Sequence, residues 1–141
     1  MGFKFEQLDV WKHAIDYVDR IYTLAEALPR SEEYNLKSQI KRAATSVALN
    51  IAEGSTGQTN AEQARFLGLA LRSLVETVAC QHLISRRGLL NDQASLREAY
   101  RAADRLAALL QGFRKKLVPG ETWLREDAEP YIPDEGAPLP F

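Results

Sequence analysis

Polar residues are spaced with unusual regularity between Leu36 and Gly54. They recur at intervals of three or four positions, which gathers them into one stripe of an α-helix: Gln39, Arg42, Ser46, Asn50 and Glu53. Amide, hydroxyl and charged groups in such a stripe form hydrogen bonds and ion pairs. A buried polar group without a partner costs about 1 to 3 kcal/mol, so the stripe is expected to meet partners on a neighbouring element.

The following helix is expected to supply those partners. If the two helices form a hairpin that turns near Gly57, Arg42 comes close to Glu76, with Gln39 and Ser73 beside them. We therefore predict an interhelical ion pair between Arg42 and Glu76. Two interpretations of this polar network stay open, because it could either fix the register of the helices or form a surface for a ligand or partner.

The sequence lacks the residue patterns of metal sites, nucleophilic catalysis and phosphate-binding loops. Di-iron sites in four-helix bundles use Glu-x-x-His motifs, which are missing, and neither His13 nor His82 has a second histidine four residues further on. The lone Cys80 is interpreted as a small packing residue, and Gly54 and Gly57 do not make a phosphate-binding loop. We predict no catalytic residue, no metal site and no cofactor, and therefore no enzyme.

Cationic side chains could bind the phosphates of RNA or DNA. The stretch from Glu121 onward carries six acids and one arginine, a net charge of −5, so the total of −1 leaves +4 for residues 1–120. The candidate nucleic-acid-binding residues are Arg86, Arg87, Arg97, Arg101, Arg105, Arg114, Lys115 and Lys116. The alternative is a set of solvated helix faces with acidic neighbours such as Glu98 and Asp104.

Four amphipathic helices must position these residues. Apolar heptad spacing, capping residues and helix breakers predict them at about 7–28, 36–54, 60–87 and 91–118. Asn35 and Asn91 are expected to cap the second and fourth helices, and Thr59 and Glu62 to form a capping box. Gly54 is expected to end the second helix in a left-handed conformation. Because the connections are short, successive helices should be antiparallel neighbours in an all-α, up-down-up-down four-helix bundle.

The first helix has an apolar arc wider than a monomeric bundle needs. One heptad stripe contains Val10, Ala14, Tyr17, Ile21, Leu24 and Leu28. A second stripe contains the four residues that we predict to contact another subunit: Trp11, Ile15, Val18 and Tyr22. We interpret the excess as an oligomer interface, with simple deep burial as the alternative.

Residues 5–118 form the predicted bundle, and residues 119–141 form an acidic, proline-rich tail that is expected to be extended or disordered. A single cysteine excludes a disulfide framework and favours a reducing, cytoplasmic location. No apolar run approaches the roughly 20 residues that span a bilayer, so no membrane partner is expected.

Three motifs carry a family resemblance: LDVW at residues 8–11, QIKRA at 39–43 and NIAEG at 50–54. With RFLGLALRSLVE at 65–76, they resemble the four helix bundle protein family, also called the 23S rRNA-intervening-sequence protein family, over about residues 5–90. Relatives of that family include the accessory variability determinant of diversity-generating retroelements, a pentameric ring that binds a reverse transcriptase and nucleic acid. The resemblance implies a homopentamer and an RNA- or DNA-binding accessory role.

The sequence departs from the family pattern at two places. Residues 55–58 replace the basic residue that commonly follows NIAEG, which weakens a nucleic-acid contact there, and Arg72 stands where the family has glycine. Two functions stay open. One is a homo-oligomeric module for nucleic acid or for an enzyme such as a reverse transcriptase. The alternative is an oligomeric scaffold that binds a protein through the first helix or the tail.

Overall fold

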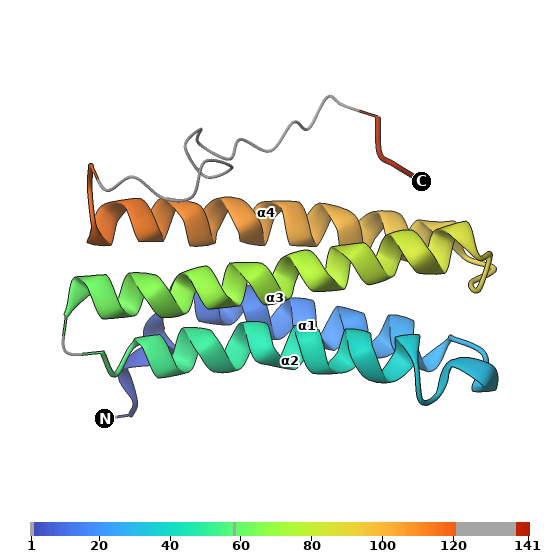
Figure 1. The fold of residues 1–141 in the computed structure, drawn as a ribbon, viewed down its shortest axis with the longest axis horizontal. Coiled ribbons are helices and arrows are strands. Elements are labelled where there is room, and N and C mark those ends of the chain that lie inside the picture. Colours follow the sequence, from blue (N-terminus) through green and yellow to red (C-terminus); the bar gives the residue numbers. More distant parts are fainter. Residues whose placement is uncertain (1, 58, 121–137) are drawn as a thin grey trace.

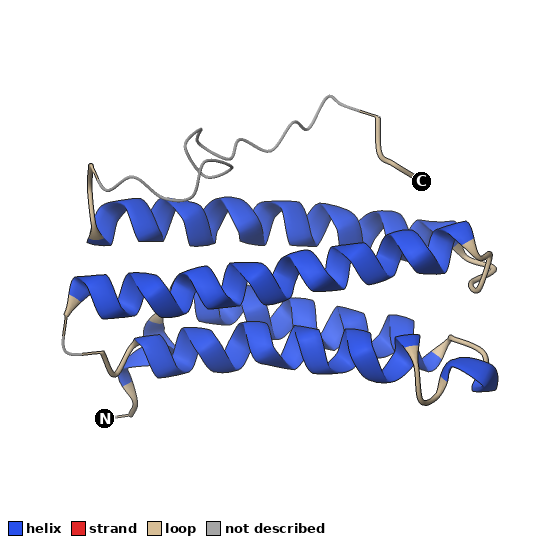
Figure 2. Ribbon diagram, viewed as in Figure 1, coloured by secondary structure: helices blue, strands red, loops and turns tan. Residues whose placement is uncertain are grey.

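The computed structural model describes residues 2–57, 59–120 and 138–141, and every regular element in them is helical (Figure 2). The elements are η1 (Lys4–Gln7), α1 (Asp9–Glu26), η2 (Arg30–Glu32), α2 (Leu36–Gly54), α3 (Asn60–Arg86) and α4 (Gln93–Leu117). Each long helix packs on its neighbours in sequence, and α4 also returns to α1 (Figure 1). The predicted all-α four-helix bundle is confirmed. No helix in the described ranges is long and apolar enough to cross a membrane.

Helix α1 buries one of its two apolar stripes. The buried stripe is Val10, Ala14, Tyr17, Ile21 and Leu24, continued by Leu28 just after the helix, each no more than 6% exposed. Facing it are apolar residues that recur every three or four positions on the other helices, among them Ile40, Val47, Ile51, Leu67, Leu74, Leu96, Leu106 and Leu110. The predicted heptads therefore converge on one core, which holds the helices together by removing apolar area from water.

Of the three helix caps predicted from the sequence, one forms in the structure and two do not. The Thr59 hydroxyl accepts a hydrogen bond from the Glu62 backbone N–H at 3.1 Å, which is one of the two reciprocal bonds of the predicted capping box. Helix α4 is capped by Asp92 rather than Asn91, and Asp92 Oδ1 accepts from the Ala94 N–H at 2.9 Å. A carboxylate is the stronger acceptor at the positive end of a helix, which favours Asp92.

The predicted cap of α2 is also wrong. Asn35 occupies the N-cap position, but its side chain makes no capping bond. Its Oδ1 instead accepts from Gln39 Nε2 at 2.8 Å. Its Nδ2 donates to Glu32 Oε1, and the same carboxylate is 3.4 Å from the Leu36 backbone nitrogen. The acidic side chain therefore takes the place that we assigned to the amide.

Gly54 ends α2 as predicted, but it does so for a different reason. Its backbone is not left-handed, since among the described glycines only Gly2, Gly88 and Gly120 have positive φ. A Cβ at Gly54 would lie 2.8 Å from Phe66 Cβ and 3.4 Å from the Gln63 carbonyl oxygen. The glycine is required because α3 approaches the end of α2 too closely for a side chain.

Alanine substitutions at two helical glycines are expected to have opposite effects on stability. Gly54→Ala should lower the free energy of unfolding by about 1 kcal/mol, because the Phe66 backbone region must move. Gly112→Ala should raise it by about 0.5 to 1 kcal/mol, since a Cβ at this exposed α4 position meets nothing within 4 Å. Urea unfolding of both variants checks this. If both substitutions changed the free energy of unfolding equally and in the same direction, the close approach of α2 and α3 would be contradicted.

Candidate functional site

Helices α1 and α2 pack against each other in a defined register. Tyr22 Oη lies 3.1 Å from Thr45 Oγ1, and one turn further along α1 the Glu26 carboxylate pairs with Lys41. Continuing the antiparallel register one turn the other way along α1 brings Val18 opposite Leu49. These helices therefore present their outward apolar residues to the same side of the bundle.

We define the α1–α2 apolar face as Ile15, Val18, Tyr22 and Leu49. Ile15 is 38% exposed, Tyr22 is 40% exposed and Leu49 is 56% exposed, while Val18 is half-buried against the core. Large apolar side chains in one contiguous stripe are an interaction surface more often than isolated ones are. This face is the first candidate site.

The sequence prediction of this face was incomplete. Trp11, predicted as its first residue, is half-buried, and its ring packs edge-on against Phe5 with 4.6 Å between centroids. Leu49 was missed because it lies outside the apolar stripe of α2 that faces the core. Only the register between α1 and α2 reveals that Leu49 continues the stripe begun by Ile15 and Tyr22. The subunit contact itself stays a prediction.

Charged groups border the apolar face at one end. The Lys41 ammonium lies 5.0 Å from the centroid of the Tyr22 ring and binds the Glu26 carboxylate. Hydrogen bonding from Lys41, supported by nearby Lys37, lowers the pKa of Glu26 below its usual value. The face therefore ends in a polar rim of paired charges, a pattern typical of protein interfaces.

Part of the predicted polar network exists between α2 and α3. Ser46 Oγ and Ser73 Oγ are 2.8 Å apart, so the two hydroxyls are hydrogen-bonded across the helix pair. Asn50 Nδ2 donates to the Ser46 carbonyl oxygen at 2.9 Å and to Ser46 Oγ at 3.1 Å. These three half-buried residues satisfy one another, which favours the interpretation that they fix helix register.

The predicted ion pair between Arg42 and Glu76 is wrong. Arg42 Nη2 instead donates to Ser38 Oγ within α2 at 3.4 Å, and no ion pair of the described residues includes Glu76. Both side chains are exposed, as are Gln39 and Glu53. In water an exposed ion pair contributes little, so nothing forces these groups together.

A second polar cluster, which the sequence analysis missed, lies in the core. Gln81 Nε2 donates to Tyr17 Oη at 2.9 Å, Tyr17 Oη is 2.6 Å from Thr77 Oγ1, and the Thr77 hydroxyl donates to the Leu74 carbonyl oxygen at 2.6 Å. Because Thr77 uses its single proton on that carbonyl, Tyr17 must donate to Thr77. Burial raises the pKa of Tyr17 far above its ordinary value. This chain links diagonal helices α1 and α3.

The predicted nucleic-acid residues are spread along the bundle. Arg86 and Arg87 lie at the end of α3, whereas Lys115 and Lys116 lie in the last turn of α4, at the opposite end of the bundle (Figure 1). Between them, three arginines follow α4 at one-turn intervals: Arg97, Arg101 and Arg105. Arg97 is half-buried and the other two are exposed. This arginine row is the candidate phosphate contact on a single helix.

Arg114 does not belong to that set, so its prediction as a phosphate contact is wrong. It is 5% exposed, and its Nη1 donates to Gln111 Oε1 at 3.1 Å. Its guanidinium lies beside Gly68, where a Cβ would be 3.5 Å from Arg114 Cζ. The small residue on α3 makes room for this side chain, which packs inside the bundle instead of reaching solvent.

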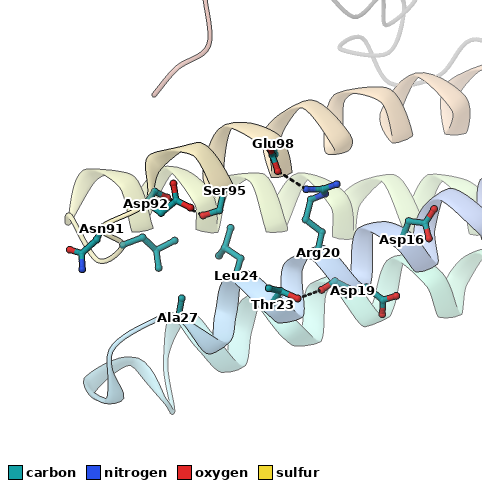
Figure 3. A pocket seen from close by; sticks show the side chains of 11 residues that line it. Asp16, Asp19, Arg20, Thr23, Leu24, Ala27, Asn91, Asp92, Ser95 and Glu98 are labelled. Atoms are coloured by element: carbon teal, nitrogen blue, oxygen red, sulfur yellow. Dashed lines mark hydrogen bonds and ion pairs between the residues drawn. The ribbon is translucent and has the colours of Figure 1, made fainter.

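Helices α1 and α4 leave an open groove of about 750 Å³ between them (Figure 3). Arg20 of α1 bridges it, with Nη1 3.0 Å from Glu98 Oε2 of α4. The other charged residues that line the groove are all acidic: Asp16, Asp19 and Asp92. Four carboxylates against one guanidinium give this groove a negative field, which repels phosphate groups.

The described residues hold no cluster of histidine, cysteine or acidic side chains that could bind a metal ion. Cys80 is buried, and burial, followed by the nearby charge of Glu76, raises the pKa of its thiol. A raised pKa keeps the thiol protonated and poorly nucleophilic, in line with a packing residue.

Comparison with known proteins gives a family and a fold. The family model described as 23S rRNA-intervening sequence protein matches residues 6–112. A crystal structure of a protein with unknown function from the S23 ribosomal protein family of Bacteroides thetaiotaomicron VPI-5482 is similar, with a TM-score of 0.69 and 24% identity. The match covers 75% of this chain and 98% of that chain, and at this identity it shows the fold alone. No curated protein matches the chain significantly.

Proposed function

Because the chain belongs to the 23S rRNA-intervening sequence protein family, we propose that it is a non-enzymatic, self-assembling binding module of the cytoplasm. We propose a homopentamer in an accessory role, contacting nucleic acid or a nucleic-acid-handling enzyme such as a reverse transcriptase. The observation that carries this proposal is the α1–α2 apolar face, where Ile15, Tyr22 and Leu49 are each more than one third exposed.

A second apolar surface supports head-to-tail assembly. Helices α3 and α4 border a groove of about 180 Å³, which we call the α3–α4 groove. Its lining is mainly apolar: Leu71, Leu74, Val75, Val78, Tyr100, Ala103, Asp104 and Ala107. In a bundle whose helices pack in cyclic order, the α1–α2 and α3–α4 edges lie on opposite sides. Two different apolar surfaces on opposite sides favour a heterologous contact, which generates a ring when the rotation closes.

The arginine row on α4 is the feature that suits nucleic acid. Arg97, Arg101 and Arg105 repeat at one-turn intervals, and a ring would present this row once per subunit. The family name, which refers to a sequence in 23S rRNA, favours RNA as the nucleic acid. Each phosphate that the protein neutralises releases counterions, so binding should weaken as salt rises.

The test is RNA binding as a function of salt. Wild-type protein titrated with mixed-sequence single-stranded RNA should bind at low salt, with log K falling linearly against log salt concentration. Arg97→Gln, Arg101→Gln and Arg105→Gln combined should flatten this slope by about two, because each lost phosphate contact removes roughly 0.7 from it for a single strand.

A matched control removes three exposed arginines from elsewhere, with Arg30→Gln, Arg42→Gln and Arg72→Gln combined. The control should keep the wild-type salt slope, since it leaves the α4 row intact. Equal slopes in the two triple variants would assign any binding to net charge alone. Failure of the wild type to bind RNA at low salt would remove nucleic acid from the proposal.

The acidic α1–α4 groove favours a second candidate, an oligomeric scaffold that binds a protein without binding nucleic acid. Asp16, Asp19, Asp92 and Glu98 would repel an RNA strand on that side of the bundle but would accept a basic protein surface. A wild-type protein that assembles and yet ignores RNA at low salt would support this candidate.

A further inference from the structure

Phe141 packs against α3 and α4, and residues 138–141 run beside α4 (Figure 1). The Phe141 ring centroid is 5.3 Å from that of His82 and 5.7 Å from that of Tyr100. The planes are inclined by 78° and 82°, which is the edge-to-face arrangement that aromatic rings prefer. We call His82 and Tyr100 the aromatic seat. Its position shows that the C-terminal end of the predicted tail returns to the bundle.

The aromatic seat is continuous with the α3–α4 groove. Tyr100 lines the groove and also contacts Phe141. On α3, the groove residue Val78 lies one turn before His82, so the same helix face carries both surfaces. Phe141 therefore lies at the Tyr100 end of the α3–α4 groove, whose volume of about 180 Å³ is enough for one large apolar side chain.

We propose that residues 138–141 compete with a second copy of this chain for the α3–α4 groove, so that the C-terminal segment limits self-association. This inference rests on the proposed self-assembly. The α1–α2 apolar face of one copy supplies large side chains, such as Leu49, that suit the groove on the next copy. Tyr100 belongs to both the α3–α4 groove and the aromatic seat. A neighbouring copy that covers both surfaces must therefore displace Phe141.

Two properties make the C-terminal segment an effective competitor. It belongs to the same chain as the groove, so its effective concentration at the seat is high without a second molecule. Pro138 and Pro140 flank Leu139 and fix the backbone φ angles, which reduces the conformational entropy lost when the segment docks. The docking is also local and displaceable, since Pro138 and Pro140 stay exposed and only Leu139 and Phe141 are half-buried.

The experiment compares full-length wild type with Phe141→Ala, using Phe3→Ala as a matched control. Phe3 is 73% exposed at the other end of the chain, and its ring contacts Phe5 rather than the seat. The first readout is the ring resonances of the two histidines in protein made with ¹³C-labelled histidine. Removing the Phe141 ring should move the His82 resonances and leave those of His13 in place.

The second readout is the self-association constant from sedimentation equilibrium. Phe141→Ala should associate about tenfold more tightly than wild type, because docking of the ring no longer competes. Phe3→Ala should match wild type in both readouts. Unchanged His82 resonances in Phe141→Ala would overturn the docking.

Two further outcomes would overturn the competition and tell the two proposals apart. If wild type assembles and Phe141→Ala assembles equally or less tightly, the competition fails and self-assembly stands. If all three proteins stay single chains at every concentration, self-assembly fails with it, whatever the His82 resonances report about docking.

Discussion

Replacing Leu49 by glutamate is expected to break the assembly into single chains. Leu49 is 56% exposed in the isolated chain and lies at the centre of the α1–α2 apolar face. A glutamate there would place a carboxylate in an apolar contact without a partner, and burying an unpaired charge costs several kcal/mol. We expect self-association to weaken by at least about 100-fold, the factor that corresponds to about 2.7 kcal/mol.

The matched control for Leu49→Glu is Ala61→Glu. Ala61 is an exposed apolar residue in the first turn of α3, outside both apolar surfaces. Both variants add the same charge, so a difference between them reports on location alone. Circular dichroism should show the wild-type helix content in both. A Leu49→Glu protein that keeps the wild-type mass at micromolar concentration would place the subunit contact elsewhere.

Replacing Tyr17 by phenylalanine is expected to destabilise the fold by about 1 to 3 kcal/mol, since it leaves buried groups of Thr77 and Gln81 without their partner. The Tyr17 hydroxyl receives a hydrogen bond from Gln81 and donates one to Thr77 inside the core. Tyr34→Phe is the matched control because Tyr34 is 96% exposed, and it should be neutral. Urea unfolding at one fixed protein concentration measures both, which keeps any coupling to assembly constant.

The Tyr17 chain also predicts a pH dependence. Burial raises the folded-state pKa of Tyr17, whereas the unfolded-state pKa is about 10. The stabilisation that this difference provides is fully present below the unfolded-state pKa and is lost as pH rises toward the folded-state pKa. Between about pH 9 and pH 11, wild type should therefore lose more stability than Tyr17→Phe. Parallel pH profiles, or equal stability of Tyr17→Phe and Tyr34→Phe, would contradict the buried chain.

The bundle was predictable because heptad spacing is a local property. The bounds of α2 agree with the prediction at both ends, and those of α3 differ by one residue at the C-terminal end. Which stripe of α1 enters the core was not predictable, because both stripes have apolar residues at heptad spacing and only the packing of the other helices distinguishes them. Of the α1 residues that we predicted to contact another subunit, Ile15 and Tyr22 are exposed in the structure.

The polar residues were harder to place because their partners are distant in sequence. Ser46 was in the predicted network because of its regular spacing on α2, and Ser73 because the expected hairpin register placed it near Arg42. Tyr17 and Gln81 are 64 positions apart, and nothing in the sequence pattern joins them. The heptad spacing of Tyr17 predicts only that its ring is buried. The hydrogen bonds of its hydroxyl group are visible only in the structure.

Charge alone was not enough to predict which basic residues reach the surface. Arg114 shares a basic run with Lys115 and Lys116, yet it points into the bundle toward Gln111 while its neighbours stay exposed. Consecutive helix positions are separated by about 100° of rotation, so a run of three cations cannot face one surface. The row at one-turn spacing, Arg97 to Arg105, is the more consistent candidate for that reason.

The molar mass of the wild-type protein in solution tests self-assembly most directly. Sedimentation equilibrium over a range of micromolar concentrations should give a mass near five times the 15.8 kDa of one chain. A single species of 15.8 kDa at every concentration would contradict self-assembly, because the α1–α2 apolar face would then be open to water in the functional protein.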